Sequence, residues 1–119
     1  MNESILTSIK KKLGITEEYE HFDDDIIIAI NSVLAILTQL GVGPRTGFRI
    51  TDKLPVWGDL LNNDLRLEMV KDFVYLRVKL LFDPPQNASL ANVQETIAKE
   101  LEWRIVIAAD QTEFDLGPT

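Results

Sequence analysis

The sequence predicts an all-α fold: a small bundle of four main helices with a long loop between the second and the third. Apolar residues recur at intervals of three and four in four separate segments, which is the period of an amphipathic helix. Glycine and proline collect between those segments rather than inside them. With 119 residues, the chain is long enough for one domain with its own core.

The first helix is expected from about residue 3 to residue 13, with Gly14 as its stop. Its apolar positions have helical spacing: Ile5, Leu6, Ile9 and Leu13. Three lysines, at 10–12, fill the last turn, where cations complement the negative end of the helix dipole. A phosphate-binding patch is the alternative interpretation of this basic run.

The second helix is expected to begin at the aspartates 23–25 and to end at Gly41. Its main apolar stripe has gaps of four and three: Ile26, Ile30, Val33, Leu37 and Leu40. Four more apolar residues widen this surface beyond one stripe: Ile27, Ile28, Leu34 and Ile36. We therefore expect a central helix that is covered on more than one side.

A long loop is expected at about 41–62. It contains four of the six glycines and two of the five prolines. A brief strand at Phe48 to Thr51 is the alternative, but a loop agrees better with this composition. Connections of this length in a compact domain are usually functional or disordered.

The third helix is expected from about residue 64 to residue 82, where the sequence FDPP ends it because proline cannot continue a helix. Arg66 and Arg77 lie within about 20° of each other around its axis. Their stems either pack on the domain while the charged heads reach water or a nearby carboxylate, or they bind a carboxylate of a neighbouring subunit.

The fourth helix is expected from about residue 90 to residue 109. One apolar stripe follows its length: Leu90, Val93, Ile97, Leu101, Ile105 and Ala108. A second apolar face appears only in the last two turns, at Trp103, Val106 and Ile107, roughly 140 to 240° around the helix from Leu101. A surface helix normally buries one stripe, so this second face needs its own partner. The partner is either the same chain, with Trp103 in the core, or a second molecule.

These elements define a helical domain over residues 1–110. Residues 111–119 are expected to form a flexible acidic tail, in which Phe114 and Leu116 are the large apolar side chains.

The composition argues against catalysis and against nucleic-acid binding. The chain has no cysteine and one histidine, His21, which lies among carboxylates in a turn. Helix capping and solvation explain those carboxylates better than a metal site does. The net charge of −7, from 12 basic and 19 acidic residues, does not suit a protein that grips phosphates. We expect no enzyme activity, no cofactor and no metal.

We also expect a soluble intracellular product. The first residues lack the apolar run and cleavage site of a secretory signal. The longest apolar run, 26–37, is too short to cross a bilayer.

The order of four sequence pieces resembles the head-tail connector, or adaptor, proteins of tailed bacteriophages. The pieces are KKKLGI at the end of the first helix, DDD at the start of the second, the stop LLFDPP, and ELEWRIVIAAD near the end. The resemblance covers nearly the whole chain. None of the pieces is a catalytic signature, so the likeness depends on their order and spacing.

The resemblance implies a structural, non-enzymatic subunit that forms a ring of about twelve copies beneath the portal protein. Such a ring lies in the virion neck, is assembled in the cytoplasm of the bacterial host, and extends the DNA channel. DNA is expected to pass without specific binding, as an acidic lumen would allow. The next neck or tail-completion protein is the expected partner on the other side.

Three sets of residues are the candidates for these contacts. The expected subunit interface comprises Trp103, Val106, Ile107, Arg66 and Arg77. The loop contributes Arg45, Phe48 and Arg49 to contacts with neighbours or the channel, and the tail contributes Phe114 and Leu116 to docking on the portal.

Three rival functions remain open. A helical protein–protein interaction module without ring assembly also predicts an exposed patch at Trp103. A helix-turn-helix DNA binder needs a recognition helix with a basic outward face, which none of the four helices offers. A small hydrolase would have to use His21.

Overall fold

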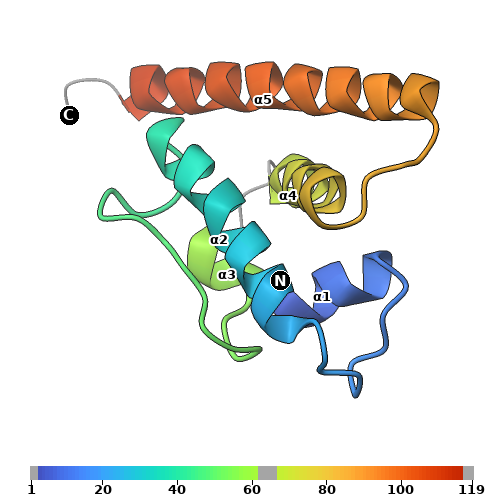
Figure 1. Cartoon of the computed structure of the whole chain (residues 1–119). Coiled ribbons are helices and arrows are strands. Elements are labelled where there is room, and N and C mark those ends of the chain that lie inside the picture. Colours follow the sequence, from blue (N-terminus) through green and yellow to red (C-terminus); the bar gives the residue numbers. More distant parts are fainter. Residues whose placement is uncertain (1–2, 62–66, 117–119) are drawn as a thin grey trace.

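The computed structural model describes residues 3–61 and 67–116, with side chains at 3–61 and 68–108. The structure has four main helices: α1 (Ile5–Lys12), α2 (Asp23–Gln39), α4 (Leu67–Phe82) and α5 (Ala88–Leu116) (Figure 1). A short helix, α3 (Trp57–Leu60), lies between α2 and α4 in the sequence. Within the described residues no strand forms, and the only bridge joins Ser4 to Val56. The all-α prediction is confirmed, and so is the loop between the second and third main helices, except that it contains α3.

Helix boundaries differ most at the end of the chain. α5 begins two residues before the expected start and runs to Leu116, so residues 111–116, which the sequence assigns to a flexible tail, are helical. The predicted division into a domain at 1–110 and a tail therefore does not coincide with a helix boundary.

α1 is fixed at both ends by local chemistry. The Ser4 hydroxyl accepts a hydrogen bond from the Thr7 amide at 3.2 Å, which caps the first turn. Gly14 has φ of 83°, and the Ile15 amide donates to the Lys10 carbonyl at 2.9 Å, as in a glycine-terminated helix.

The basic run at the end of α1 is divided between two environments. Lys10 is 2% exposed, and its Nζ lies 2.8 Å from Asp23 Oδ1 and 3.0 Å from the Glu17 carbonyl. It therefore joins α1, the 14–22 loop and the start of α2. Lys11 and Lys12 are exposed, as a dipole-complementing turn predicts.

α2 is the central helix, as the sequence predicts. Its inner residues are fully buried: Ile26, Ile30, Val33, Leu34 and Leu37. Helices α1 and α4 pack against it. Ile28, which we expect on the widened apolar surface, is 65% exposed.

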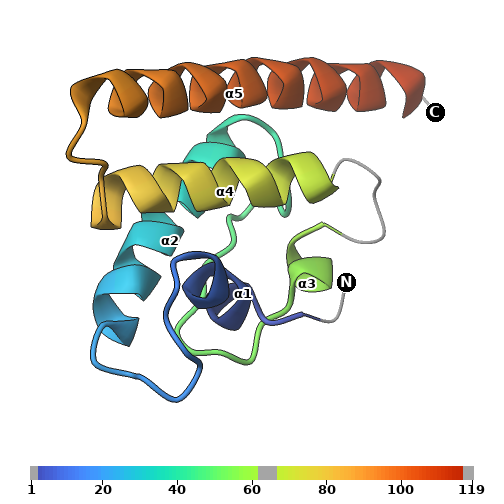
Figure 2. The same ribbon diagram turned by 90° about the vertical axis from the view of Figure 1, so that its right-hand side faces the viewer.

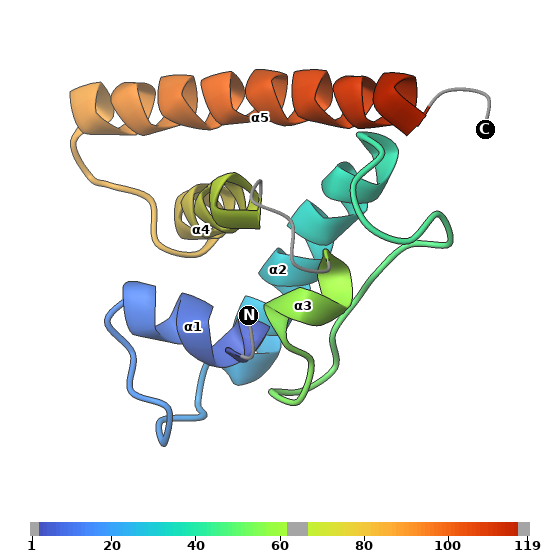
Figure 3. The same ribbon diagram turned by 180° about the vertical axis from the view of Figure 1, so that it is seen from behind.

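The segment from Gly41 to Val56 runs back along α2 as an ordered strap (Figure 3). Asn31 on α2 holds its middle, because its Nδ2 donates to the Ile50 carbonyl and its Oδ1 accepts from the Ile50 amide, both at 2.8 Å. Two apolar side chains of the strap, Val42 and Ile50, are buried.

The end of the strap and α3 are hydrogen-bonded to α1. The Ile5 amide donates to the Pro55 carbonyl at 3.0 Å. Trp57 is 1% exposed, and its Nε1 donates to the Ser8 hydroxyl at 2.8 Å.

α4 forms the middle layer, with α5 on one side and α1 and α2 on the other (Figure 2). Its buried side chains are Val70, Phe73, Val74 and Val78. The prolines after Asp83 end the helix, and α5 then returns antiparallel to α4 (Figure 2). α5 is consequently an outer element of the molecule.

Candidate subunit-contact surface

α5 buries a different stripe from the one that its pattern predicts. Ala98 is fully buried and Ile105 is 2% exposed, and the two lie within about 20° of each other around the helix. Leu90, Val93 and Ile97, which we expect in the core, are 49%, 53% and 43% exposed. The predicted core stripe is therefore wrong for the first half of α5.

The physical reason is the size of the side chains that face α4. Ala91, Ala98 and Ile105 recur every seven residues, and they are partly buried, fully buried and buried, respectively. Small side chains such as alanine allow two helices to pack closely. This contact turns the larger residues of the first half about 80 to 140° away from Ala98. The seven-residue spacing of the alanines is the sequence signal that would have identified the buried side.

Trp103 lies at the surface. It is 63% exposed, and Ile107, one turn further along, is 36% exposed. Val106 is partly buried. The interpretation of Trp103 as a core residue is wrong, because its own chain leaves most of the indole uncovered.

The exposed apolar side chains of α5 share one side of the helix. They lie within an arc of about 140°, and we call them the α5 outer face: Leu90, Val93, Ile97, Trp103 and Ile107. Among them, Arg104 Nη2 and Glu100 Oε1 form an ion pair at 2.8 Å. No described element covers this side of α5 (Figures 1 and 2). A protein of this size rarely leaves so large an apolar stripe uncovered without an interaction partner.

Arg77 is paired inside the chain. Its Nη1 lies 2.7 Å from Glu95 Oε1 and its Nη2 lies 3.8 Å from Glu102 Oε1, both on α5. The guanidinium also lies 5.8 Å from the centre of the Phe73 ring. Arg77 thus stabilises the contact of α4 with α5, as its packing interpretation predicts, and its role at a subunit interface stays a prediction. Arg66 lies outside the described residues.

The loop candidates separate into one anchor and two exposed cations. Phe48 is partly buried and packs against the core. Arg45 and Arg49 are exposed. The tail candidates Phe114 and Leu116 belong to the last turns of α5, where the structure does not describe side chains.

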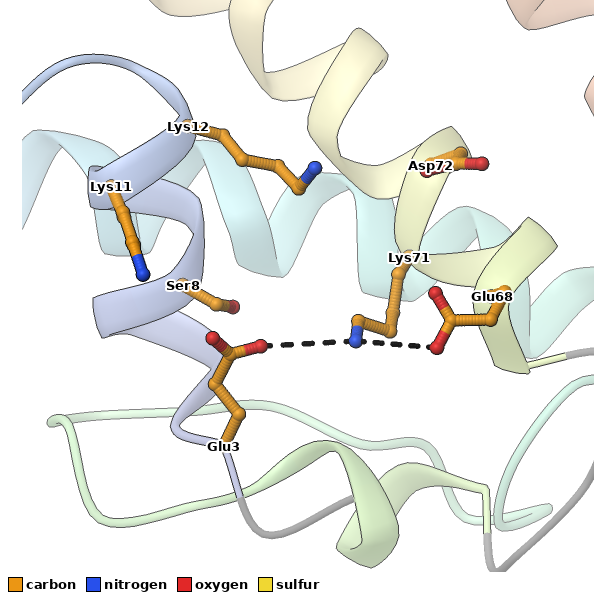
Figure 4. A pocket seen from close by; sticks show the side chains of 7 residues that line it. All are labelled: Glu3, Ser8, Lys11, Lys12, Glu68, Lys71 and Asp72. Carbon is orange, nitrogen blue, oxygen red and sulfur yellow. Dashed lines mark ion pairs between the residues drawn. The ribbon is translucent and has the colours of Figure 1, made fainter.

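A pocket of about 350 Å³ lies between α1 and the start of α4 (Figure 4). Lys71 Nζ points into it between Glu3 and Glu68, at 3.7 and 3.6 Å from their carboxylate oxygens. The Ser8 hydroxyl donates to the Ile5 carbonyl at 3.0 Å and accepts from Trp57, so no base activates it. The pocket brings together charges that neutralise one another and no nucleophile–base pair.

His21 does not form a site with the carboxylates around it. It is exposed, and its ring packs edge-on against Phe22 at 4.8 Å between centroids. Among the described residues no group of three His, Asp or Glu side chains is placed to hold a metal ion. In the same part of the chain, none of the helices has both the length and the apolar content needed to span a membrane.

A comparison with known protein families identifies the family of the chain. The profile of the family described as phage connector protein matches residues 5–112. The chain belongs to this family. Phage connector proteins are structural and not enzymes, so the hydrolase alternative is wrong for this chain.

The matched region of this phage connector protein begins at the first residue of α1 and takes in most of α5. The α5 outer face therefore lies within the part that defines the family. No curated protein and no solved structure matches the chain.

Proposed function

We propose that this phage connector protein is a head-tail connector subunit that forms a ring beneath the portal protein. The ring extends the DNA channel in the virion neck and presents its far side to the next neck or tail-completion protein. A ring of about twelve copies is the expected stoichiometry, and assembly takes place in the cytoplasm of the bacterial host.

The observation that carries this proposal is the uncovered α5 outer face. Within one copy, α5 already packs against α4 through Ala98 and Ile105. The outer face is a second apolar surface on the same helix, which suits lateral packing on a neighbouring subunit. Large aromatic side chains such as Trp103 supply much of the binding energy of protein interfaces.

The charge of the protein supports a channel through which DNA passes without specific binding. The chain carries a net charge of −7. An acidic lumen repels the phosphate backbone, so DNA would not adhere during packaging or ejection.

Sedimentation velocity and negative-stain microscopy test the proposal. The purified protein is examined at increasing concentration, alone and with the portal protein of the same phage. We expect annular particles of uniform size. The variant Trp103→Ser with Ile107→Ser should weaken assembly by about 30-fold or more, since two interface anchors are lost.

Ile28→Ser with Leu54→Ser is the matched control, because both residues are exposed apolar side chains outside α5, at 65% and 76%. This control should assemble like the wild type. Discrete complexes of one or two copies with a protein partner, and no annular particles, would instead support the helical interaction module.

A further inference from the structure

The strap after α2 presents two arginines on a firmly held backbone. Its apolar side chains Val42 and Ile50 are buried, and Asn31 fixes the backbone of Ile50 through two hydrogen bonds. The turn at the tip closes with a hydrogen bond of 3.0 Å from the Gly47 amide to the Pro44 carbonyl. With the apolar residues anchored inward, Arg45 and Arg49 are exposed.

These two arginines have no carboxylate partner among the residues whose side chains the structure describes. Of the four arginines that the structure describes, Arg77 and Arg104 form ion pairs with residues of α5. Arg45 and Arg49 form none with any described residue. In a chain with a net charge of −7, an unpaired arginine pair is an unusual local excess of positive charge.

The segment before α2 has the complementary character. Glu18, Glu20, Asp24 and Asp25 are exposed, and the aromatic rings of Tyr19 and Phe22 lie among them, 49% and 36% exposed. We call these six residues the acidic aromatic surface.

The acidic aromatic surface is held in place from beneath. Phe22 packs edge-on against Phe82 of α4 with 5.6 Å between ring centroids, and Tyr19 lies 5.8 Å from Phe22. Lys10 also fixes the backbone of this segment, because its ammonium group binds the Glu17 carbonyl and the Asp23 carboxylate. A partner that docks here therefore loses little entropy in ordering the surface.

Arginine is the cation that fits such a surface best. Its planar guanidinium binds a carboxylate through two parallel hydrogen bonds and also stacks on an aromatic face. The combination of exposed carboxylates with exposed rings therefore favours arginine over a simple point charge.

Among the described residues, Arg45 and Arg49 form no ion pair with the acidic aromatic surface of their own copy. Arg45 lies near the carboxyl end of α2, where Gly47 approaches Thr38, whereas the acidic aromatic surface surrounds the amino end. Arg49 lies between them, because it precedes Ile50, which Asn31 holds near the middle of α2. The 17 residues of α2 place these ends about 25 Å apart.

We propose that Arg45 and Arg49 of one copy bind the acidic aromatic surface of a second copy. The contact is head-to-tail, with different surfaces of the two molecules, as a closed ring requires. This inference rests on the proposed ring and adds a second, polar contact to the apolar one made by the α5 outer face.

Charge reversal on each surface, first separately and then in combination, tests whether the two surfaces bind each other. We expect Arg45→Glu with Arg49→Glu to abolish assembly, measured by sedimentation velocity alone and with portal, and Glu18→Lys with Glu20→Lys to do the same. Mixed in equal amounts, the two variants should assemble again, because only unlike copies then present opposite charges to each other. A single chain that carries all four substitutions should also assemble.

Lys11→Glu with Lys12→Glu is the matched control, since it makes the same change in net charge at exposed positions of α1. This control should assemble like the wild type. Wild-type association should also weaken as salt is raised, because exposed charges are screened.

The outcomes separate this inference from the proposed function. If the wild type assembles and the arginine variant assembles equally well, the polar contact is refuted while the ring stands. If the arginine variant fails and mixing does not restore it, the arginines act on another partner, such as DNA or portal, and the inference is overturned. If the wild type forms no assembly even with portal, the ring and the contact are both refuted.

Discussion

Two tryptophans occupy opposite environments in this protein. Trp57 is 1% exposed and donates a hydrogen bond to Ser8, which joins α3 to α1. Trp103 is 63% exposed on the outer side of α5. The same residue type therefore serves as a core anchor at one position and as a candidate contact at the other.

The pair makes a direct stability prediction. Trp57→Ala should lower the free energy of unfolding by about 3–5 kcal/mol, because it leaves a cavity and removes the hydrogen bond that the Ser8 hydroxyl accepts. Trp103→Ala should change it by less than about 0.5 kcal/mol. Urea unfolding of both variants under conditions in which the protein is monomeric measures the difference. A loss at Trp103 as large as that at Trp57 would mean that the indole is part of the core.

Lys10 illustrates a residue whose role is hidden in the sequence. A lysine in the last turn of a helix ordinarily points to solvent and complements the dipole. Here it is buried because Asp23, at the start of the next helix, comes within 2.8 Å of it. Only the tertiary arrangement of α1 and α2 distinguishes Lys10 from its exposed neighbours Lys11 and Lys12.

At the level of elements, the four main helices were predictable because each has a clear period and a clear stop. Gly14 ends α1, Gly41 follows α2, and the prolines after Asp83 end α4. The short α3 was not predictable, because four residues carry no period.

Which side of α5 is buried was harder to predict than the presence of the helix. Large apolar residues are distributed around much of the helix, so hydrophobicity alone gives no unique side. The choice follows from close packing of Ala98 against α4, which depends on interhelical distance rather than on residue hydrophobicity. That an outer apolar face exists was predictable, and Trp103 and Ile107 belong to it, but Leu90, Val93 and Ile97 were missed.

The strap offers a prediction at the same scale. Asn31→Ala removes both hydrogen bonds to Ile50 and should cost about 1–3 kcal/mol, since a backbone donor and acceptor lose their partner. Amide hydrogen exchange at Ile50 should accelerate more than exchange in α4. Asn92→Ala, at an exposed position of α5, is the control and should leave both quantities unchanged. Unaltered protection of Ile50 in Asn31→Ala would show that the strap is held by other contacts.

At the scale of the whole molecule, one architecture accounts for the fold and for the proposed assembly. Helices α1, α2 and α4 bury most of their large apolar residues in a common core, and α5 covers one side of α4 with a narrow buried stripe. The remaining apolar surface of α5 faces outward, and Arg45 lies near the carboxyl end of α2, opposite the acidic aromatic surface at its amino end. We expect such a molecule to fold as a monomer and to have distinct surfaces left for its neighbours.

If a neighbouring subunit covers the α5 outer face, Trp103 must become less accessible to solvent on assembly. The variant Trp57→Phe leaves Trp103 as the only tryptophan, because the chain has two. Acrylamide quenching of its fluorescence, compared between the monomer and portal-bound assemblies, reports on the accessibility of the indole. We expect quenching to fall several-fold on assembly and the emission to shift to shorter wavelength. Equal quenching in both states would refute a subunit contact at this face, because Trp103 would then remain in water within the assembled ring.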